Sequence, residues 1–305
     1  MKKLICIVFI CLSLAAHGQQ RPIQSLYMFD NLLINPAYAG NQVQLSATAI
    51  YRNQWVNLEG APSTATATVH SGFLRDKMGL GVIISNDQIG IHNDFSFYGV
   101  YAYKIKFNQS VQLSMGLQAG FNNLVSDFNK LNNKNPNDPN LSGINSKLNP
   151  NFGTGFFLSY PGGYFSLSVP YLLNNEIIDF EGVLSSARQR RNYYLSAGRT
   201  VEISKDLKII PSTLIRVQEQ GPLSLDINTT FVFYDAVGFG ISYRLNDSVV
   251  GLFEIKINEN FHAGYAYDIT NSALNAFSNG THEIMVNYRV RLNRWHKGLE
   301  CPSYF

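Results

Sequence analysis

The sequence predicts an all-β fold, a transmembrane antiparallel up-and-down β-barrel of about 14 strands with short periplasmic turns and longer extracellular loops. Apolar and polar residues alternate with a period of two from about residue 43 to residue 292. Short and long connections alternate along the chain between these stretches. Only 15% of the residues are charged, and no apolar run beyond the first twenty residues is as long as a transmembrane helix. Strands are therefore the remaining way for this chain to cross a membrane.

The first 18 residues are expected to be a cleaved secretory signal peptide. Lys2 and Lys3 give it a basic start, an apolar stretch runs from Leu4 to Ala16, and Gly18 is a small residue at the expected cleavage point. Cleavage removes both lysines and so lowers the formal net charge by two, from +3 to +1. This near-balance of charge gives no sign of nucleic-acid binding.

Three regions are expected after the signal peptide. Residues 19–42, which contain LLINPAYAG, form an N-terminal periplasmic segment that could also tuck against or into the barrel floor. Residues 43–292 form the barrel, and residues 293–305 form a basic, aromatic tail that could dock on a periplasmic partner or stay unstructured. Cys301 is the one cysteine outside the signal peptide, so an internal disulfide is excluded.

Residues 110–122, SVQLSMGLQAGFN, show the alternation clearly. Successive side chains of an extended chain point to opposite faces, so this stretch has one apolar face and one polar face. In a barrel the apolar face meets outer-membrane lipid and the polar face lines the lumen, whereas in a soluble sandwich the apolar face meets a second sheet. The expected strands are 43–53, 63–73, 78–86, 93–107, 110–122, 150–160, 163–170, 190–203, 207–217, 222–233, 235–245, 248–258, 260–269 and 281–292.

The connections favour the barrel over the sandwich. Tight turns are expected at 74–77, 108, 161–163, 204–206 and 259, and longer extracellular loops at 54–62, 87–92, 122–149, 171–189 and 270–280. This sorting is typical of outer-membrane barrels and has no reason to occur in a sandwich. Asn246-Asp247 breaks the rule, since it is an outward connection by count but has the composition of a two-residue hairpin turn. The Asn-rich stretch 122–149 is interpreted as an exposed loop within one domain.

The sequence gives no sign of enzymatic chemistry, and we expect no catalytic residue, no cofactor and no metal site. The five histidines outside the signal peptide do not have the spacing of a zinc site. Ser71 follows His70 directly, and neighbours in a strand point to opposite faces, so they cannot form a nucleophile and base pair.

Charged residues fall mostly on the polar, lumen-facing side of the expected strands. Such residues can pair with one another and stiffen the wall, or they can bind a plug or a ligand. The lumen-facing set is Arg52, Lys104, Asp226, Arg244, Glu254, Lys256, Asp268, Glu283, Arg289 and Arg291.

Several stretches match the motifs of a known protein family. They are SLYMFDNLLINPAYAG (25–40), YRNQW (51–55), GAPST (60–64), GLGVIISNDQIG (79–90), YAYKI (101–105), LSMGLQAGF (113–121) and CPSYF (301–305). They resemble the PorP/SprF family of Bacteroidetes outer-membrane proteins. The resemblance is densest from about residue 25 to residue 121 and returns at residues 301–305. It implies a barrel in the outer membrane that is associated with type IX secretion and gliding. Such a barrel is either a component of the core secretion apparatus or an accessory protein whose gene lies beside that of one adhesin.

The same motifs supply the candidate partner-binding residues, which are Asn35, Pro36, Tyr38, Arg52, Gln54, Trp55, Asn86 and Asp87. Asn35-Pro36 favours a turn or an extended entry into the barrel. Trp55 suits a membrane interface and Arg52 a pore-lining pair. The alternative is that Arg52, Gln54 and Trp55 are only a signature of the fold.

The leading hypothesis is a non-enzymatic barrel that helps a type IX substrate, a large adhesin-like protein, to leave the cell or to stay on its surface. Its expected partners are outer-membrane lipid, the secreted adhesin and periplasmic secretion or motor components, with no nucleic acid. The alternative is an outer-membrane transport pore for small solutes or hydrophobic compounds. A barrel lipid hydrolase is a third, weaker hypothesis.

Overall fold

The structure, a computed structural model, describes residues 23–41, 45–74, 76–108, 110–130, 143–175, 188–271 and 277–290. The expected signal peptide (1–18), the tail (293–305) with Cys301, and Arg291 lie outside the described residues. Among the described residues, no helix is long and apolar enough to cross a bilayer.

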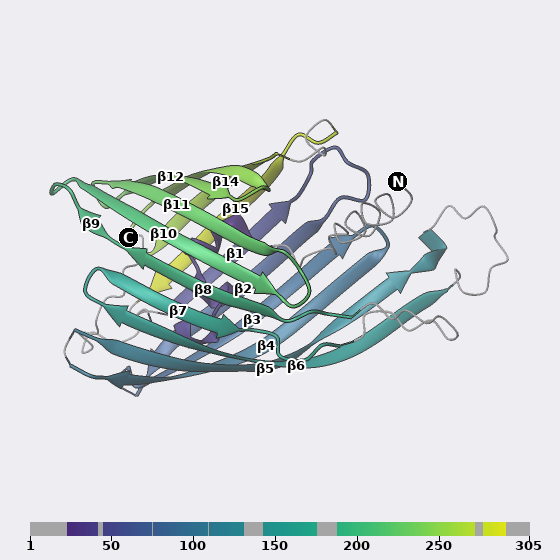
Figure 1. The fold of residues 1–305 in the computed structure, drawn as a ribbon, viewed down its shortest axis with the longest axis horizontal. Helices are drawn as coiled ribbons and strands as arrows, with labels where there is room; N and C mark the ends of the chain where they lie inside the picture. The colour runs from purple at the N-terminus through teal and green to yellow at the C-terminus, as the bar shows by residue number, and fades with distance from the viewer. Residues whose placement is uncertain are drawn as a thin grey trace, which may run out of the picture.

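The described chain forms one closed antiparallel β-barrel (Figure 1). Each strand pairs with its neighbours in the sequence, and β15 pairs with β1 to close the ring. The two-residue β9 pairs only with β10 and continues β8, so the wall has 14 strands, as predicted. The strands are β1 (Leu45–Asn53), β2 (Ser63–Phe73), β3 (Met78–Ile89), β4 (His92–Lys106), β5 (Gln112–Asp127), β6 (Ile144–Tyr160), β7 (Gly163–Val169), β8 (Asn192–Arg199), β9 (Val201–Glu202), β10 (Leu207–Gln218), β11 (Leu223–Phe233), β12 (Val237–Arg244), β13 (Ser248–Lys256), β14 (Phe261–Thr270) and β15 (Thr281–Val290).

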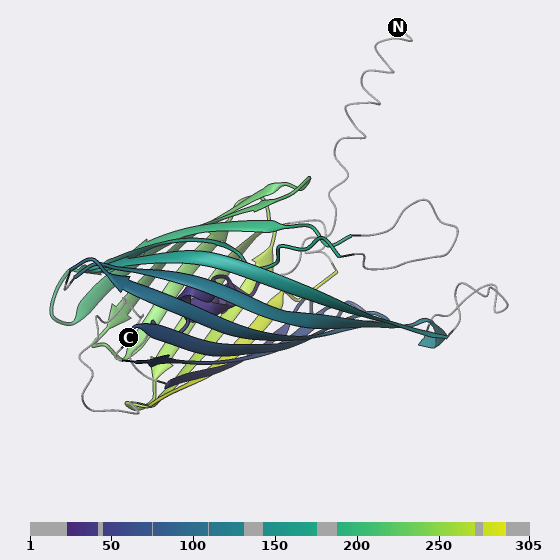
Figure 2. The same ribbon diagram turned by 90° about the horizontal axis from the view of Figure 1, so that it is seen from below.

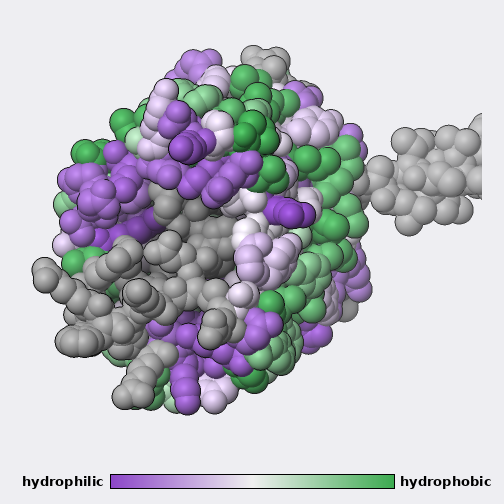
Figure 3. Space-filling model, turned by 90° about the vertical axis from the view of Figure 1, so that its left-hand side faces the viewer, coloured by the Kyte–Doolittle hydropathy of each residue, from purple (hydrophilic) through white to green (hydrophobic). Residues whose placement is uncertain are grey.

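The two faces of the wall differ as the alternation predicts. On β5, Gln112, Ser114 and Gln118 are buried in the lumen, while Leu117 on the outer face is 60% exposed. The predicted lumen-facing charges within the described residues are buried, apart from the half-buried Lys256. A view from the end that carries the short turns shows hydrophilic residues around the mouth and hydrophobic residues on the outer wall (Figure 3). The apolar face therefore points outward, and within the described residues no second sheet packs against it.

Two connections are shorter than predicted, because the strands beside them are longer. Residues 87–92 were expected to be a loop, but β3 ends at Ile89 and β4 begins at His92, with a tight turn at Gly90. In the expected loop 122–149, β5 and β6 stay paired from Asn122↔Asn149 to Asp127↔Ile144, and the middle lies outside the described residues. Backbone pairing needs no apolar side chains, so polar strand ends leave no alternating signal.

The N-terminal segment lies inside the barrel rather than beside it (Figure 2). Residues 23–41 form three short 3₁₀ helices, η1 (Ser25–Met28), η2 (Asn31–Leu33) and η3 (Pro36–Tyr38), and nearly all of their side chains are buried. We call residues 23–41 the plug. Residues 19–42 were expected to form a periplasmic segment that could also tuck against or into the barrel floor. Their described part is lumenal, because apolar plug residues pack against apolar lumen residues.

Candidate functional site: the plugged lumen

The plug fills the lumen with two apolar clusters. In the first, Leu26, Tyr27 and Met28 pack with residues of β1, β8, β10, β11, β13, β14 and β15 that include Leu214 and Met285. In the second, Leu32, Ala37, Tyr38 and Ala39 pack with residues of β3, β4, β6 and β7 that include Tyr98 and Phe157. Burying these side chains stabilises the plug by roughly 1.5–3 kcal/mol for each large apolar one. The plug is therefore part of the folded core.

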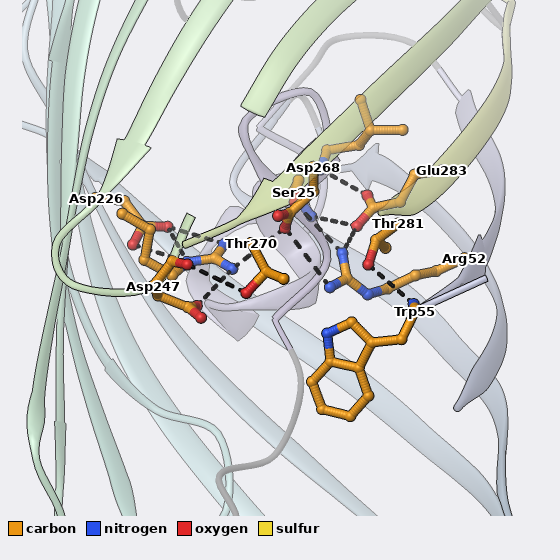
Figure 4. Close-up of polar contacts among 11 residues, drawn as sticks. Ser25, Arg52, Trp55, Asp226, Asp247, Asp268, Thr270, Thr281 and Glu283 are labelled. Carbon is orange, nitrogen blue, oxygen red and sulfur yellow. Dashed lines mark hydrogen bonds and ion pairs between the residues drawn. The ribbon is translucent and has the colours of Figure 1, made fainter. Parts of the chain in front are cut away.

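Glu283 on β15 binds the start of the plug (Figure 4). Its two carboxylate oxygens accept the backbone N–H groups of Ser25 at 2.7 Å and Leu26 at 3.0 Å. The same carboxylate accepts a hydrogen bond from Arg52 on β1, which also lies 3.8 Å from Asp268. All three charged side chains are almost fully buried. The amides at the start of η1, which have no partner within a helix, are thus satisfied by a charged lumen side chain.

A second arginine, Arg244 on β12, extends this network to Asp226, which is labelled with Asp268 in Figure 4. Its Nε lies 3.1 Å from Asp226, and its Nη1 lies 3.7 Å from Asp268 and 3.4 Å from Asp247. Asp268 thus lies between the two arginines, and Asp226 is joined to Arg244 by three hydrogen bonds. We call Arg52, Arg244, Asp226, Asp268 and Glu283 the ion-pair network. These residues all lie near the strand ends that carry the longer connections, which we call the long-loop end.

Asn35 holds the middle of the plug against β6 and β7. Its side-chain oxygen accepts the N–H of Ala37 at 2.8 Å, which caps η3. Its side-chain nitrogen donates to the carbonyl of Phe156 at 2.9 Å and to the hydroxyl of Ser166 at 2.7 Å. The side chain is fully buried and uses both its donor and its acceptor. Asn35 is therefore an anchor of the plug within the wall.

Pro36 and Tyr38 belong to the same anchor. Pro36 is the first residue of η3, where its fixed φ favours the turn. The ring of Tyr38 lies edge-on to His70 at 5.5 Å and to Phe157 at 5.4 Å between ring centroids. Both residues are buried in the lumen.

Three lumen-facing glycines make room for the NPAYAG motif. A β-carbon on Gly79 of β3 would overlap the carbonyl oxygen of Ala39, and one on Gly116 of β5 would overlap the amide nitrogen of Ala37. A β-carbon on Gly155 of β6 would overlap the side-chain oxygen of Asn35. We call Gly79, Gly116 and Gly155 the glycine seat. At Gly79 and Gly116 the backbone of the plug touches the backbone of the wall, and at Gly155 the side chain of Asn35 touches it; only glycine permits an approach this close.

The last residues of the plug bind polar side chains at the opposite end, the short-turn end. The N–H of Gly40 donates to Nδ1 of His70 at 3.2 Å, and Lys104 donates to the Gly40 carbonyl. Gly40 has φ +64°, which favours glycine. The plug thus runs down the lumen from Glu283 near the long-loop end to Lys104 near the short-turn end.

A cavity of about 110 Å³ remains inside the barrel, between the plug and wall residues near the long-loop end. Asp87 on β3 faces it and accepts a hydrogen bond from Thr64 at 2.6 Å. Tyr171, in the connection after β7, also lines it and lies edge-on to Tyr98 at 5.3 Å. The chain therefore enters the lumen a second time beyond β7, beside the plug.

The loops at this end are joined by Glu219, which follows β10. Its carboxylate accepts a hydrogen bond from Asn174 at 3.0 Å and lies 3.4 Å from Nη1 of Arg191. The Asn174 hydrogen bond, followed by the charge of Arg191, holds the pKa of the Glu219 carboxyl below its usual range. The connection between β7 and β8 is thus attached to the turn between β10 and β11.

The predicted partner-binding residues do not form one site. Asn35, Pro36, Tyr38 and Arg52 are buried in the lumen and Asp87 lines its cavity. Gln54 and Trp55 begin the loop 54–62, where Trp55 adopts φ +49° and donates its backbone N–H to Thr281 at 3.2 Å. Asn86 and Asp87 are neighbours in β3 rather than loop residues, and so point to opposite faces of the wall.

Sequence reasoning found the charged lumen residues but not how they pair. Pairing between Arg52 on β1 and Glu283 on β15 depends on ring closure and on register, and an alternating pattern fixes neither. The glycine seat was also missed. Its sequence signal was the presence of Gly79, Gly116 and Gly155 at polar-face positions, where a wall residue should carry a side chain.

The described residues contain no group of three or more His, Cys, Asp or Glu side chains that could hold a metal ion. The chemistry of the lumen is ion pairing and hydrogen bonding between the plug and the wall. Such an arrangement binds a peptide segment.

Comparison with solved structures shows the same kind of barrel. The structure titled "CymD monoaromatic hydrocarbon channel" matches with a TM-score of 0.54 at 10% identity, over 92% of this chain and 96% of that chain. The Acinetobacter baumannii outer membrane protein Omp33 matches with a TM-score of 0.47 at 8% identity, over 81% of this chain and 99% of that chain. The Pseudomonas putida toluene transporter TodX matches with a TM-score of 0.46 at 8% identity, over 90% and 94%. Identities this low show the fold alone.

At the level of sequence, no curated protein matches the chain. One family model does match, described as "Type IX secretion system membrane protein PorP/SprF", and it covers residues 16–288. That range includes the plug and all but the last residues of the barrel wall. The chain therefore belongs to the PorP/SprF family of type IX secretion system membrane proteins.

Proposed function

We propose that this protein is a plugged outer-membrane barrel that helps a large adhesin-like substrate of type IX secretion to leave the cell or to stay on its surface, without enzymatic chemistry. The observation that carries the proposal is the plug, which occupies the lumen and is held there by Glu283 at one end and by Lys104 at the other. A lumen occupied in this way is a poor route for a solute. The two ends of the barrel are then the working surfaces.

We place the long-loop end outside the cell and the short-turn end in the periplasm, after removal of a signal peptide. Strands β4, β5 and β6 are 15, 16 and 17 residues long, whereas about 9–11 residues cross a membrane. The excess lies at the long-loop end, where the β5–β6 hairpin extends beyond the rest of the wall (Figure 1). Periplasmic secretion or motor components then meet the short-turn end.

The β5–β6 hairpin is the part of this end that we expect to bind the exported protein. Ile144 is 66% exposed and Leu148 is 64% exposed, near the tip of the described hairpin. Apolar side chains exposed beyond the membrane favour contact with another protein. The candidate residues Gln54, Trp55 and Asn86 lie at the same end of the barrel and stay part of this proposal.

The alternative, a transport pore for small solutes or hydrophobic compounds, has the shared fold in its favour. The monoaromatic hydrocarbon channel CymD has a similar barrel, but at 10% identity this likeness does not indicate a substrate for the present chain. Because the plug occupies the lumen, a pore of the full lumen width is not expected.

Purification of a tagged protein from crosslinked cells tests the proposal. We expect one or a few large exported proteins to copurify, and deletion of the protein to reduce their amount at the cell surface. The double variant Ile144→Ser, Leu148→Ser removes apolar contact area and should weaken the copurification. Phe107→Ser is the matched control, because Phe107 is equally exposed, at 64%, but lies at the short-turn end. Unchanged surface proteins in the deletion strain, together with solute flux through the purified protein, would favour the pore instead.

A further inference from the structure

The first half of β6 has a neighbouring strand on one side only. β5 pairs with residues 144–159 of β6, whereas β7 pairs only with residues 154–160. After β7 ends, the chain enters the lumen, where Tyr171 lines the cavity. Within the described residues, one edge of β6 is therefore without a paired strand over residues 144–153.

The connection after β7 covers the part of this edge that lies next to β7. The N–H of Leu172 donates to the carbonyl of Phe152 at 2.8 Å, and the side-chain nitrogen of Asn175 donates to the carbonyl of Pro150 at 2.8 Å. In a strand, the N–H and C=O of one residue point to the same side, and successive residues point to opposite sides. The even-numbered residues of β6 thus present their backbone groups to this edge.

The remaining part of the edge is formed by Ile144, Ser146 and Leu148, and we call it the open edge of β6. The carbonyl of Gly143, just before β6, accepts the N–H of Phe128, in agreement with odd-numbered residues facing β5. In the part of the chain that the structure describes, no group bonds to the backbone of the open edge on this side. A row of unpaired backbone groups on an edge strand is a template for another strand.

The open edge lies beyond the membrane. About 9–11 residues of a tilted strand cross the hydrocarbon layer, so a span that starts at Tyr160 on the short-turn side ends near Pro150. The β5–β6 hairpin extends past the rest of the wall at this end (Figure 1). Lipid therefore does not cover the open edge, and a protein segment can reach it from the aqueous side.

Two copies of this chain cannot pair through their open edges. Copies inserted in one membrane share one orientation, so their β6 strands run parallel to each other. In a parallel ladder the open edge of one strand would have to meet the opposite edge of the other. That opposite edge of β6 is already occupied by β5. The occupant that fits is therefore a strand of a different protein.

We propose that the open edge of β6 binds an extended segment of the exported protein as an added β-strand. Hydrogen bonds to the backbone supply the binding, and alternate side chains supply the selection. Ile144 and Leu148 are exposed on the outer face of the hairpin, while Asn145 and Lys147 lie on the opposite face. The added strand thus alternates apolar and polar residues. The inference rests on the proposed function only for the identity of this partner.

Hydrogen exchange of the purified full chain in detergent, measured at single amides by mass spectrometry, tests whether the edge is open. We expect the amides of Ser146 and Leu148 to exchange as in an unstructured peptide. The amides of Asn145 and Lys147 face β5 and should exchange at least about tenfold more slowly. Equal protection of all four amides would show that another segment already covers the edge, and would overturn the proposal.

A labelled peptide of four Thr-Val repeats with a lysine at each end is the probe for strand addition. We expect it to bind the purified protein and to slow the exchange of the Ser146 and Leu148 amides. Ser146→Pro removes an edge N–H that β5 does not use, and should weaken the binding at least about tenfold. Ser146→Ala keeps this N–H and is the matched control, with unchanged binding. The same peptide with alternate N-methylated amides should not bind.

Measurements in cells separate this inference from the proposed function. Ser146→Pro should lower the amount of exported protein that is crosslinked to the barrel several-fold, whereas Ser146→Ala should not. Probe binding that requires the Ser146 N–H, with unchanged surface proteins in both the Ser146→Pro and the deletion strains, would support the strand-binding edge and contradict the role in secretion. Probe binding that is equal in the native and Ser146→Pro proteins would overturn the edge, even where deletion of the protein depletes the cell surface.

Discussion

Gly116 on β5 and Ala37 in the plug meet backbone to backbone, so closely that a β-carbon on Gly116 would overlap the amide nitrogen of Ala37. Gly79 meets the plug backbone in the same way at Ala39, and Gly155 meets the side-chain oxygen of Asn35. Contact over three strands fixes both the depth and the rotation of the plug. The NPAYAG motif and these wall glycines are therefore complementary surfaces of one chain.

Gly116→Val should displace the plug and destabilise the barrel. The added side chain has no space, and overpacking of this kind costs about 1–3 kcal/mol. We expect a lower temperature for loss of heat-modifiable gel mobility, and faster proteolysis of the N-terminal segment. Gly251→Val is the control, because Gly251 lies on β13 where an added β-carbon meets nothing within 4 Å. Equal stability of the two variants would show that the plug does not rest on Gly116.

Glu283→Gln should weaken the start of the plug and leave Arg52 poorly paired. Removing one partner of a buried ion pair costs about 3–5 kcal/mol, here reduced because Asp268 lies 3.8 Å from the Arg52 guanidinium. Thermal unfolding of Glu283→Gln, Arg52→Gln and the double variant forms a double-mutant cycle that isolates the coupling. Glu202→Gln, at an exposed position of β9, serves as the reference. Additive effects of the two substitutions would contradict the pairing.

The barrel could be predicted from the sequence because its signal is local. Alternation such as Leu113 to Phe121 needs only the period of two, and it placed the strands and their two faces correctly. The polar ends of β5 and β6 were missed because backbone pairing there is not accompanied by apolar alternation.

The plug could not be predicted to the same extent, because it depends on contacts between distant residues. The bond from Ser25 to Glu283 joins positions 258 residues apart, and no local pattern encodes it. Asn35 and Tyr38 were predicted as partner contacts, and in the structure their side chains anchor the plug within the lumen. In the sequence, neither a glycine on a lumen face nor an Asn-Pro turn indicates a contact between plug and wall. Only the fold, which brings the two together, shows it.

Asn35 should tolerate neither Ala nor Asp, for different reasons. Asn35→Ala removes the cap of η3 and two wall contacts, and the loss of such a cap alone costs about 0.5–2 kcal/mol. Asn35→Asp keeps the acceptor for Ala37 but cannot donate to Phe156 or Ser166, and it buries a charge. Protease resistance of the plug and thermal unfolding measure both effects. An Asp variant as stable as the native protein would rule out the donor role.

The loop contact of Glu219 should depend on pH. Because the folded state holds the pKa of this carboxyl below its usual value of 4.5, the contact contributes above that value and is lost as the pH falls through the lowered pKa. Spin labels at the exposed positions 173 and 220, which leave Asn174 in place, should therefore separate only under strongly acidic conditions. Glu219→Gln keeps the shape of the side chain and should remove this acid-dependent step. A step that persists in the Gln variant would assign it to another group.

Planar-bilayer recordings should show that the plug, not the barrel, limits conduction. The native protein should pass little steady current, because residues 23–41 pack against the lumen wall and occupy most of the lumen. Deletion of residues 23–41 should give stable open channels, and Glu283→Gln should give brief openings, since the start of the plug is then held less firmly. Glu219→Gln, a loop substitution outside the lumen, should conduct like the native protein. Native conductance equal to that of the deletion would show an open lumen, and it would favour a solute pore over a plugged secretion component.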